Sequence, residues 1–306
     1  MREHARASAP GSIGNVGPGL DILGLAVAGA HDAVEVRWNN GPKTVVEDAG
    51  HPDLPTDPSR NTAAIAAMAV LQRTGARHGL RIRVTKGLPL SGGQGGSAAS
   101  AVAGAVAADA LGETGLDHRT LLACCLEAEA AVAGRHLDNI SPSLLGGLVL
   151  VRSVEPSDVI ALPVPDHLGV VLVHPAQQLQ TRDARAALPA TVPREVALAQ
   201  AANVAAMVAG AFLGDLALLG RAIDDRIAEP VRAKMLPGFR EARVAALAAG
   251  AVGCSISGAG PTAFALTEGT EVAARVADAM VAAYRAAGMA ARPIITTVDT
   301  QGARVG

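Results

Sequence analysis

The residues with the most evident chemistry lie in Pro89–Ala99, which reads Pro-Leu-Ser-Gly-Gly-Gln-Gly-Gly-Ser-Ala-Ala. Four of the five positions 92–96 are glycine, and good helix formers follow them. Backbone without Cβ atoms folds tightly, so its N–H groups can converge on an anion at the positive end of the next helix. The pattern favours a phosphate-binding loop, although a glycine-rich turn without a ligand has the same composition.

Three familiar phosphate-binding motifs fit this segment poorly. A P-loop requires Gly-Lys-Ser/Thr, and none of the three lysines (Lys43, Lys86, Lys234) stands in that context. A dinucleotide fingerprint follows directly after a strand, whereas Gly87–Ser91 separates this loop from the expected strand 80–85. A protein-kinase loop requires His-Arg-Asp and Asp-Phe-Gly motifs, which the sequence lacks. An NAD-binding domain therefore stays only a distant alternative.

Length and composition allow two domains, or one large one, with a substantial core, since the chain has 306 residues of which 50% are hydrophobic. A net charge of −2 and few aromatic residues (one Trp, one Tyr, three Phe) argue against nucleic-acid binding. The spacing of Cys124, Cys125 and Cys254 indicates neither a metal site nor a disulfide framework. No apolar segment follows the first residues, and polar residues interrupt 194–219, so we expect a cytoplasmic protein without membrane attachment.

Helical and strand patterns are mixed along the chain, which predicts an α+β or α/β fold. Helices are expected at 61–74, 97–111, 117–134, 194–219 with 215–228 in some division, 237–249 and 271–287. Strands are expected at 33–38, 80–85, 148–153, 159–162, 169–174, 253–257, 264–266 and 292–298. The proline-containing region between the strands 159–162 and 169–174 is the candidate domain boundary, and we expect domains at 1–153 and 154–306.

Three further segments could complete a site around the glycine loop. The glycine-rich Pro10–Asp21 carries Asn15 and Asp21, on a backbone suited to close approach to a small polar ligand. Arg135–Asn139 is expected as a polar loop between a helix and a strand, and Ser257–Pro261 as a second glycine turn. Taken singly, each segment also reads as an ordinary turn.

Taken together, and in this order along the chain, the segments resemble the GHMP kinase family and, within it, the kinases of L-homoserine. Asn15–Leu25 is similar to the opening motif of that subfamily, Pro89–Ala99 to the ATP loop of the family, and His136–Gly147 to its Asp-Asn-x-x-Pro segment. The matching set is completed by Thr181–Arg185, Ala228–Arg232 and Ser257–Pro261. In the ATP loop, Gln94 stands where leucine is usual and Gly96 where the first serine is usual.

The resemblance implies a two-domain GHMP kinase fold of the α+β class. Its N-terminal domain would resemble the ribosomal protein S5 domain 2-like fold, and its C-terminal domain a ferredoxin-like α/β sandwich. It implies transfer of the γ-phosphate of ATP, with Mg²⁺, to the side-chain hydroxyl of L-homoserine, a step toward threonine. ATP and L-homoserine are the expected partners, nucleic acid and membrane are not, and a homodimer stays open.

The resemblance also implies roles for individual residues. ATP would be held by Asn61 and by the loop residues Pro89, Leu90, Ser91, Gly92, Gly93, Gln94, Gly95, Gly96, Ser97, Ala98 and Ala99. The Ser97 hydroxyl and the Glu129 carboxylate form a plausible pair of hard oxygen ligands for Mg²⁺. The segment before Asn139 is one residue shorter than expected, so Glu127 is the next candidate for the metal.

The amino-acid substrate would be held through its two charges and its hydroxyl. Arg185 and Arg232 would bind its carboxylate with forked donors, and Thr181 would add a hydroxyl contact. Asp21 would bind its ammonium group, while Asn15 and Asn139 would orient the reacting hydroxyl. The expected catalytic residues are Asn15, Asn139, Ser97 and Glu129. None is a convincing general base, so we expect catalysis by alignment and charge stabilisation, with the proton leaving late.

Two other functions stay open beside this one. A GHMP kinase acting on a different small alcohol would have no use for two arginines and Asp21 together. A non-catalytic member that binds nucleotide for regulation would fit the loss of the serine at Gly96, although the retained Ser97, Glu129 and Asn139 argue against it.

Overall fold

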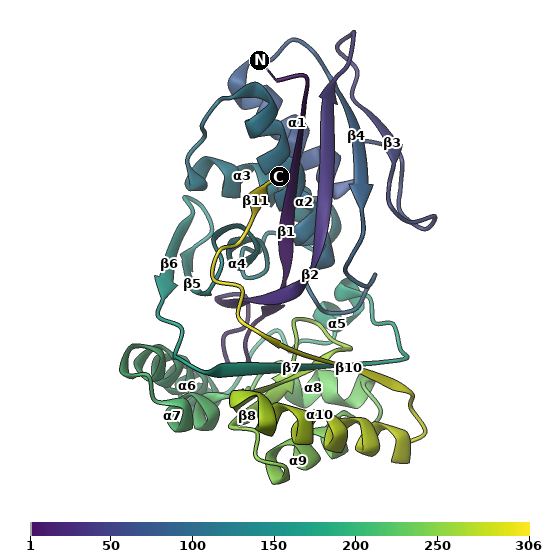
Figure 1. The fold of residues 1–306 in the computed structure, drawn as a ribbon. Helices are drawn as coiled ribbons and strands as arrows, with labels where there is room; N and C mark the ends of the chain where they lie inside the picture. Colours follow the sequence, from purple (N-terminus) through teal and green to yellow (C-terminus); the bar gives the residue numbers. More distant parts are fainter. Residues whose placement is uncertain (1) are drawn as a thin grey trace.

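The computed structural model describes residues 2–306, which form two β-sheets with their own helices (Figure 1). The 7-stranded sheet has the order β11-β1-β2-β4-β3, with β5 paired to β2 and β6 to β5. Its strands are β1 (His4–Gly14), β2 (Leu23–Trp38), β3 (Val45–Asp48), β4 (Leu80–Thr85), β5 (Leu148–Ser153), β6 (Asp158–Leu162) and β11 (Arg304–Val305). Its helices are α1 (Thr62–Thr74), α2 (Gly96–Gly112), α3 (His118–Val132) and α4 (Ile140–Leu145).

The central helix of this half is α2, which packs against β1 and β2 and carries α1 and α3 on its other sides. Its alanine-rich sequence is buried nearly all round, as expected for a helix enclosed by other elements. At Gly104 a Cβ atom would lie 2.3 Å from the carbonyl oxygen of Ala63, so glycine lets α1 approach closely. This packing fixes the start of α2, and with it the loop before it.

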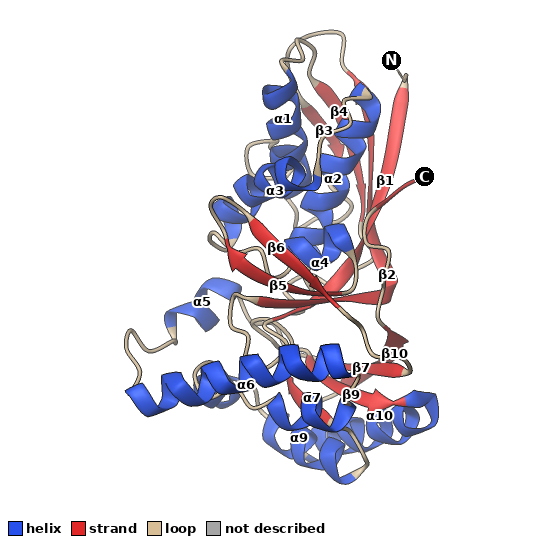
Figure 2. Ribbon diagram, turned by 90° about the vertical axis from the view of Figure 1, so that its left-hand side faces the viewer, coloured by secondary structure: helices blue, strands red, loops and turns tan. Residues whose placement is uncertain are grey.

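The second half is built on a 4-stranded antiparallel sheet of order β10-β7-β9-β8. Its strands are β7 (Leu168–Pro175), β8 (Gly253–Ile256), β9 (Ala263–Glu268) and β10 (Ala291–Thr297). Its helices are α5 (Thr181–Ala186), α6 (Arg194–Leu213), α7 (Leu216–Ala222), α8 (Glu229–Arg232), which continues into a 3-10 turn, α9 (Phe239–Ala248) and α10 (Gly269–Ala286). Figure 2 shows α6 on the outer side of this half and α5 between the two halves.

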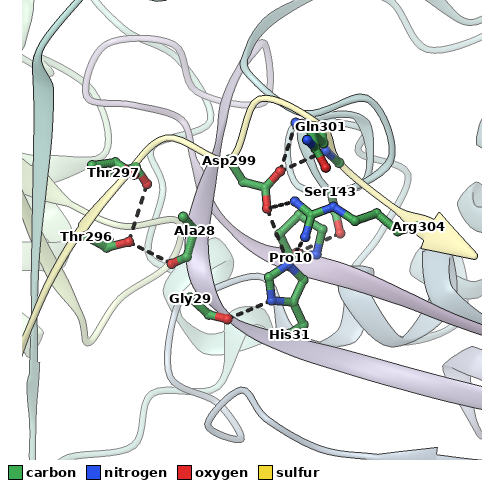
Figure 3. Close-up of polar contacts among 11 residues, drawn as sticks. Pro10, Ala28, Gly29, His31, Ser143, Thr296, Thr297, Asp299, Gln301 and Arg304 are labelled. Carbon is green, nitrogen blue, oxygen red and sulfur yellow. Dashed lines mark hydrogen bonds and ion pairs between the residues drawn. The ribbon is translucent and has the colours of Figure 1, made fainter. Parts of the chain in front are cut away.

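The last residues return from the second half to the first, where β11 pairs with β1 (Figure 1). Asp299 holds this segment in place, as Figure 3 shows. Its carboxylate accepts hydrogen bonds from the backbone N–H groups of Gln301 and Gly302 at 2.9 Å, and it lies 3.3 Å from His31 Nε2 and 2.5 Å from Arg304 Nη2. The C-terminal segment thus ties the second half to β2 of the first sheet.

The structure confirms the mixed α+β class and differs from the predicted elements in several places. Pro10–Gly14, expected as part of a flexible loop, is buried strand at the end of β1, because β2 pairs with it. The expected helix 194–219 is two helices, since Gly214 adopts a left-handed conformation and Asp215 caps α7. The expected helix 215–228 ends at Ala222.

Three short helices, α4, α5 and α8, were not predicted. The hydrogen bonds also place β6 and β11 in the first sheet, although both lie beyond residue 153. The predicted division into 1–153 and 154–306 therefore stays a proposal.

Candidate active site

The glycine loop has the conformation that its composition predicted. Gly93 and Gly95 have φ angles of +71° and +67°, and Gly95 is the N-cap of α2. A Cβ atom on Gly95 would lie 2.1 Å from Ser12 Oγ, and one on Gly93 would lie 2.6 Å from the carbonyl oxygen of Gly260. Only glycine fits at these two positions. The N–H groups of the loop and the positive end of α2 are therefore presented together, as anion binding requires.

The second half of the molecule supports this loop from behind. Ser257 Oγ donates to the carbonyl oxygen of Gly93, and Thr262 Oγ1 to that of Gly92, both at 2.6 Å. The buried Gln94 side chain donates to Thr262 Oγ1 at 3.3 Å, so its amide has a polar partner inside the protein. The second glycine turn therefore contacts the first glycine loop directly.

A buried ion pair holds the other side of the loop. Lys86 Nζ donates to the Asp32 carboxylate, and also to the carbonyl oxygen of Gly96 at 3.1 Å. Asp32, which is fully buried, accepts in turn from the N–H groups of Gly87 and Leu88 and from Ser100 Oγ. Sequence reasoning missed this pair, and the scarcity of lysine was the one signal pointing to Lys86.

A cavity of about 750 Å³ opens over the loop. Its lining includes most of the predicted ATP residues: Asn61, Pro89, Leu90, Ser91, Gly92, Gly93, Gly95, Gly96 and Ser97. Gln94, Ala98 and Ala99 are buried and do not line it. Asn61 caps α1, with Oδ1 accepting from Ala64 N and Nδ2 donating to the carbonyl oxygen of Pro55. Asn61 thus shapes the cavity wall, and its predicted contact with adenine stays a prediction.

Ser97 and Glu129 meet at the inner part of this cavity. Ser97 Oγ donates to Glu129 Oε2 at 3.5 Å, and Glu129 is only 6% exposed. Burial raises the pKa of Glu129 to about 8, and the nearby Asp138 charge adds to the rise. A buried carboxylate beside a hydroxyl is a donor set of the kind that Mg²⁺ prefers. Without a cation, the Glu129 carboxylate holds a proton instead. Glu127, the other candidate, instead pairs with Arg73 at 2.7 Å on the outer side of α3.

The predicted substrate residues gather next to these groups. Arg185 Nη1 and Nη2 donate to the two Asp21 carboxylate oxygens at 3.0 and 2.7 Å. Burial alone would raise the pKa of Asp21, but the hydrogen bonds from Arg185 and the nearby charge of His136 lower it. His136 Nδ1 lies 3.7 Å from Asp21 Oδ1, a contact that the sequence analysis did not include.

Arg232 and Asn15 meet at a single backbone oxygen. Both donate to the carbonyl oxygen of Gly258, Arg232 Nη1 at 2.9 Å and Asn15 Nδ2 at 3.0 Å. Arg232 is 3% exposed, its Nε has no partner, and burial together with the charge of Arg185 lowers its pKa. A buried cation with a free donor is suited to a carboxylate ligand.

Asp138 and Asn139 connect the residues at the glycine loop with the predicted substrate residues around Asp21. Asn139 accepts from Ser12 Oγ at 2.9 Å, and its Nδ2 donates to Asp138 Oδ2 at 3.3 Å. Asp138 lies in the predicted polar loop, which leads into the helix α4 rather than directly into a strand, and it is only 4% exposed. Burial raises the pKa of Asp138 to about 7, and the charge of Asp21 adds to the rise.

Of the predicted substrate residues, Thr181 and Asn139 line the cavity. Thr181 is the first residue of α5 and lines the cavity from the second half of the molecule. Arg185 lies one helical turn further along α5, so the helix carries one residue at the cavity and one at the Asp21 pair. The contact of Thr181 with substrate stays a prediction.

The known proteins that are similar to this chain belong to one family, the GHMP kinases. Residues 61–147 match the family described as GHMP kinases N terminal domain, and residues 202–286 match GHMP kinases C terminal. The homoserine kinase of Chlorobium phaeobacteroides is 39% identical over 292 residues, which cover 91% of each chain. That of Arabidopsis thaliana is 41% identical over 307 residues, covering 97% of this chain and 83% of its own. The crystal structure of homoserine kinase from Cytophaga hutchinsonii is 39% identical and superimposes with a TM-score of 0.95, covering 100% and 98% of the two chains.

Proposed function

The chain belongs to the homoserine kinases of the GHMP kinase family, and on this premise we propose that it transfers the γ-phosphoryl group of ATP to the side-chain hydroxyl of L-homoserine. The observation that supports the proposal is the clustering of Asp21, Arg185 and Arg232, whose charges act on one another, while the charge of Arg185 also acts on Glu129, which lines the loop cavity. We expect a zwitterionic amino acid bound among these charges to direct its hydroxyl toward the phosphate end of the nucleotide.

The loop residues bind the triphosphate through backbone N–H groups and the N-terminus of α2. The hydrogen bonds from Ser257 and Thr262, together with the Lys86 contact to Gly96, hold those N–H groups in position before the nucleotide arrives. Such preorganisation matters because phosphoryl transfer depends on alignment and on stabilising charge rather than on covalent help from the protein.

Ser97 and Glu129 are the residues that would hold Mg²⁺, which supplies charge neutralisation for the phosphate oxygens. Glu129 must lose its proton to bind a cation. Because its pKa is about 8, Glu129 would give up that proton at neutral pH when its carboxylate holds the cation.

Substrate binding exchanges one ion pair for two. The substrate carboxylate takes the forked donors of Arg185 and the free donor of Arg232, and the ammonium group takes Asp21. Asn15 and Asn139 would orient the hydroxyl, since Asn15 Oδ1 accepts from the N–H of Asp21 at 3.1 Å and Asn139 lies beside Gly95 of the ATP loop. The hydroxyl proton leaves late, without a dedicated base.

The experiment that tests the proposal is a screen of ADP release with Mg²⁺-ATP against L-homoserine, L-serine, L-threonine and mevalonate. We expect turnover of L-homoserine well above the rate without acceptor. Turnover of mevalonate with none of L-homoserine would mean that a different alcohol is the substrate. Release at the same low rate with every acceptor would favour a regulatory nucleotide-binding protein instead.

A further inference from the structure

Helix α6 lies on the outer side of the second half (Figure 2), and its side chains have an inverted arrangement for a surface helix. Leu198 and Phe212 are each 64% exposed, whereas the amides of Gln200 and Asn203 point inward. Among the described residues, α6 is also the one helix long and apolar enough, by length and composition, to cross a membrane. Because a buried amide is unfavourable unless its polar groups are paired, a buried glutamine on so apolar a helix indicates that its contacts matter.

The Gln200 side chain uses both of its amide hydrogens and its amide oxygen. Its Nε2 donates to the carbonyl oxygen of Pro18 at 2.5 Å and to Asp225 Oδ1 at 3.0 Å. Its Oε1 accepts from the backbone N–H of Arg226 at 2.8 Å. Two acceptors on one side of the amide and a donor on the other fix its orientation. A thioether of the same length would offer no donor to either acceptor.

The first of these acceptors, the Pro18 carbonyl, belongs to a turn with strained backbone. Asn15, Val16 and Gly17 have φ angles of +69°, +46° and +80°, so three consecutive residues are left-handed, and one of them is β-branched. Such a conformation persists only where surrounding contacts hold it. The turn carries two of the expected substrate residues, because Asn15 Oδ1 accepts from the N–H of Asp21 at 3.1 Å. The bond from Gln200 therefore holds the segment that presents both.

The second acceptor, Asp225, organises the backbone that leads into α8. Its buried carboxylate accepts from the N–H groups of Ile227, Ala228 and Glu229 at 2.9, 3.0 and 2.8 Å. The carbonyl oxygen of Ala228 accepts in turn from the N–H of Arg232 at 3.0 Å. The backbone position of Arg232 is thus connected to Gln200 through Asp225.

We propose that Gln200 is a positioning residue of the substrate site, which keeps the turn carrying Asp21 at a fixed spacing from Arg232. This rests on the proposed function, in which Asp21 binds the ammonium group and Arg232 the carboxylate of one amino acid. The Gly258 carbonyl joins the side chains of Asn15 and Arg232, whereas Gln200 joins the backbone segments that carry them. A small ligand with two charges at a set separation requires that spacing to be kept.

Steady-state kinetics of Gln200→Met tests this role, because methionine keeps the length of the side chain and removes its donors. We expect KM for L-homoserine to rise about tenfold or more, while KM for ATP stays within about twofold. The two values should separate because Ser257, Thr262 and Lys86 hold the ATP loop without Gln200. Gln200→Asn, which keeps the amide but is one methylene shorter, should show the same separation and serves if Gln200→Met does not fold.

Asn203→Leu is the matched control on the same helix. It also removes an inward-pointing amide, but the hydrogen bond of Asn203 goes to the carbonyl oxygen of Asp224 at 2.8 Å rather than to Pro18. Both variants should lose thermal stability, and only Gln200→Met should raise KM for L-homoserine. An unchanged KM in Gln200→Met, or an equal rise in Asn203→Leu, would overturn the positioning role.

Hydrogen–deuterium exchange followed by mass spectrometry tests the same role without any substrate. In Gln200→Met, peptides covering residues 15–23 should exchange at least about tenfold faster than in the wild type, because the N–H groups of Gly19 and Asp21 are bonded within the turn. Exchange in α2 should not change. Unchanged exchange at 15–23 would overturn the role of Gln200 whatever the substrate is. A wild type without turnover of L-homoserine, but with the expected change in exchange, would overturn the proposed function alone.

Discussion

Arg185 and Asp21 form a forked ion pair, with Arg185 Nη1 and Nη2 donating to the two carboxylate oxygens at 3.0 and 2.7 Å. Both side chains are one-third exposed, so substrate can reach them. The two residues that we expect to bind opposite ends of the amino acid therefore satisfy each other when it is absent. This keeps both charges paired, and we expect it to favour a ligand that carries both an ammonium and a carboxylate group.

Arg185→Ala should weaken the capture of L-homoserine far more than that of ATP. Loss of a hydrogen bond to a charged group costs roughly 1.5–3 kcal/mol, so kcat/KM for L-homoserine should fall about 10- to 150-fold. Arg185→Lys should recover little, because an ammonium group lacks the planar fork. Steady-state kinetics with homoserine amide, which has no carboxylate charge, is the control. An equal loss on the amide would show that Arg185 does not bind the carboxylate.

Exchanging the charges of the pair separates its structural role from its role in binding. Asp21→Arg combined with Arg185→Asp restores an ion pair, so thermal stability should exceed that of either single variant. Activity on L-homoserine should stay low, because the charges then face the wrong ends of the substrate. Recovery of wild-type kcat/KM in the double variant would mean that the pair only supports the fold.

Glu129→Gln should lower kcat and raise the Mg²⁺ concentration needed for half-maximal activity, since it removes a charged metal ligand. Ser97→Ala should act in the same direction with a smaller effect. Glu127→Gln is the matched control, because its carboxylate pairs with Arg73 and should not affect the Mg²⁺ titration. A Glu127→Gln variant with the larger shift would transfer the metal role to that residue.

The stability of the metal-free protein should decrease as the pH rises from about 5 to about 8. Burial holds the pKa of Glu129 at about 8 and that of Asp138 at about 7, well above their ordinary values. Over this range the folded state keeps protons that the unfolded chain has released, so the free energy of unfolding falls with rising pH. Thermal melts with EDTA should show the decrease, and Glu129→Gln should make it shallower. An unchanged slope in that variant would contradict a protonated Glu129.

Two neighbouring glycines should respond differently to the same substitution. Gly95→Ser forces a side chain into a left-handed backbone and within 2.1 Å of Ser12 Oγ, so we expect loss of ATP binding and of activity by at least about tenfold, at about 1.4 kcal/mol per decade. Gly96→Ser should be tolerated, because a Cβ atom there lies no closer than 3.4 Å to any neighbour. Calorimetric ATP titration of both variants checks this pair. Equal losses would mean that the loop rearranges freely.

The sequence was sufficient to locate the loop, the helix after it and most of the residues around the site. It could not show which of them touch, because the contacts join distant parts of the chain. Asp32 and Lys86 are 54 residues apart, and neither has a local signature. The strand at Pro10–Gly14 was mistaken for loop, because its proline, glycine and serine content indicates turns while the pairing with β2 that makes it a strand is not local.

The sequence also did not show which apolar residues of α6 face outward. Gln200 and Asn203 seemed to interrupt an apolar segment, and only the structure shows that they are its buried side. Periodicity gives the face of a helix but not the direction in which it points. The inverted arrangement of α6 therefore required coordinates.

The central claim is the transfer of phosphate to the side-chain hydroxyl of L-homoserine, and phosphorus NMR of the reaction mixture tests it most directly. With Mg²⁺-ATP and L-homoserine, we predict a new phosphomonoester signal that couples to the side-chain methylene protons and grows in step with ADP. Arg185→Ala should slow its appearance at low L-homoserine concentration. Formation of ADP with only inorganic phosphate, or of no product at all, would contradict the account.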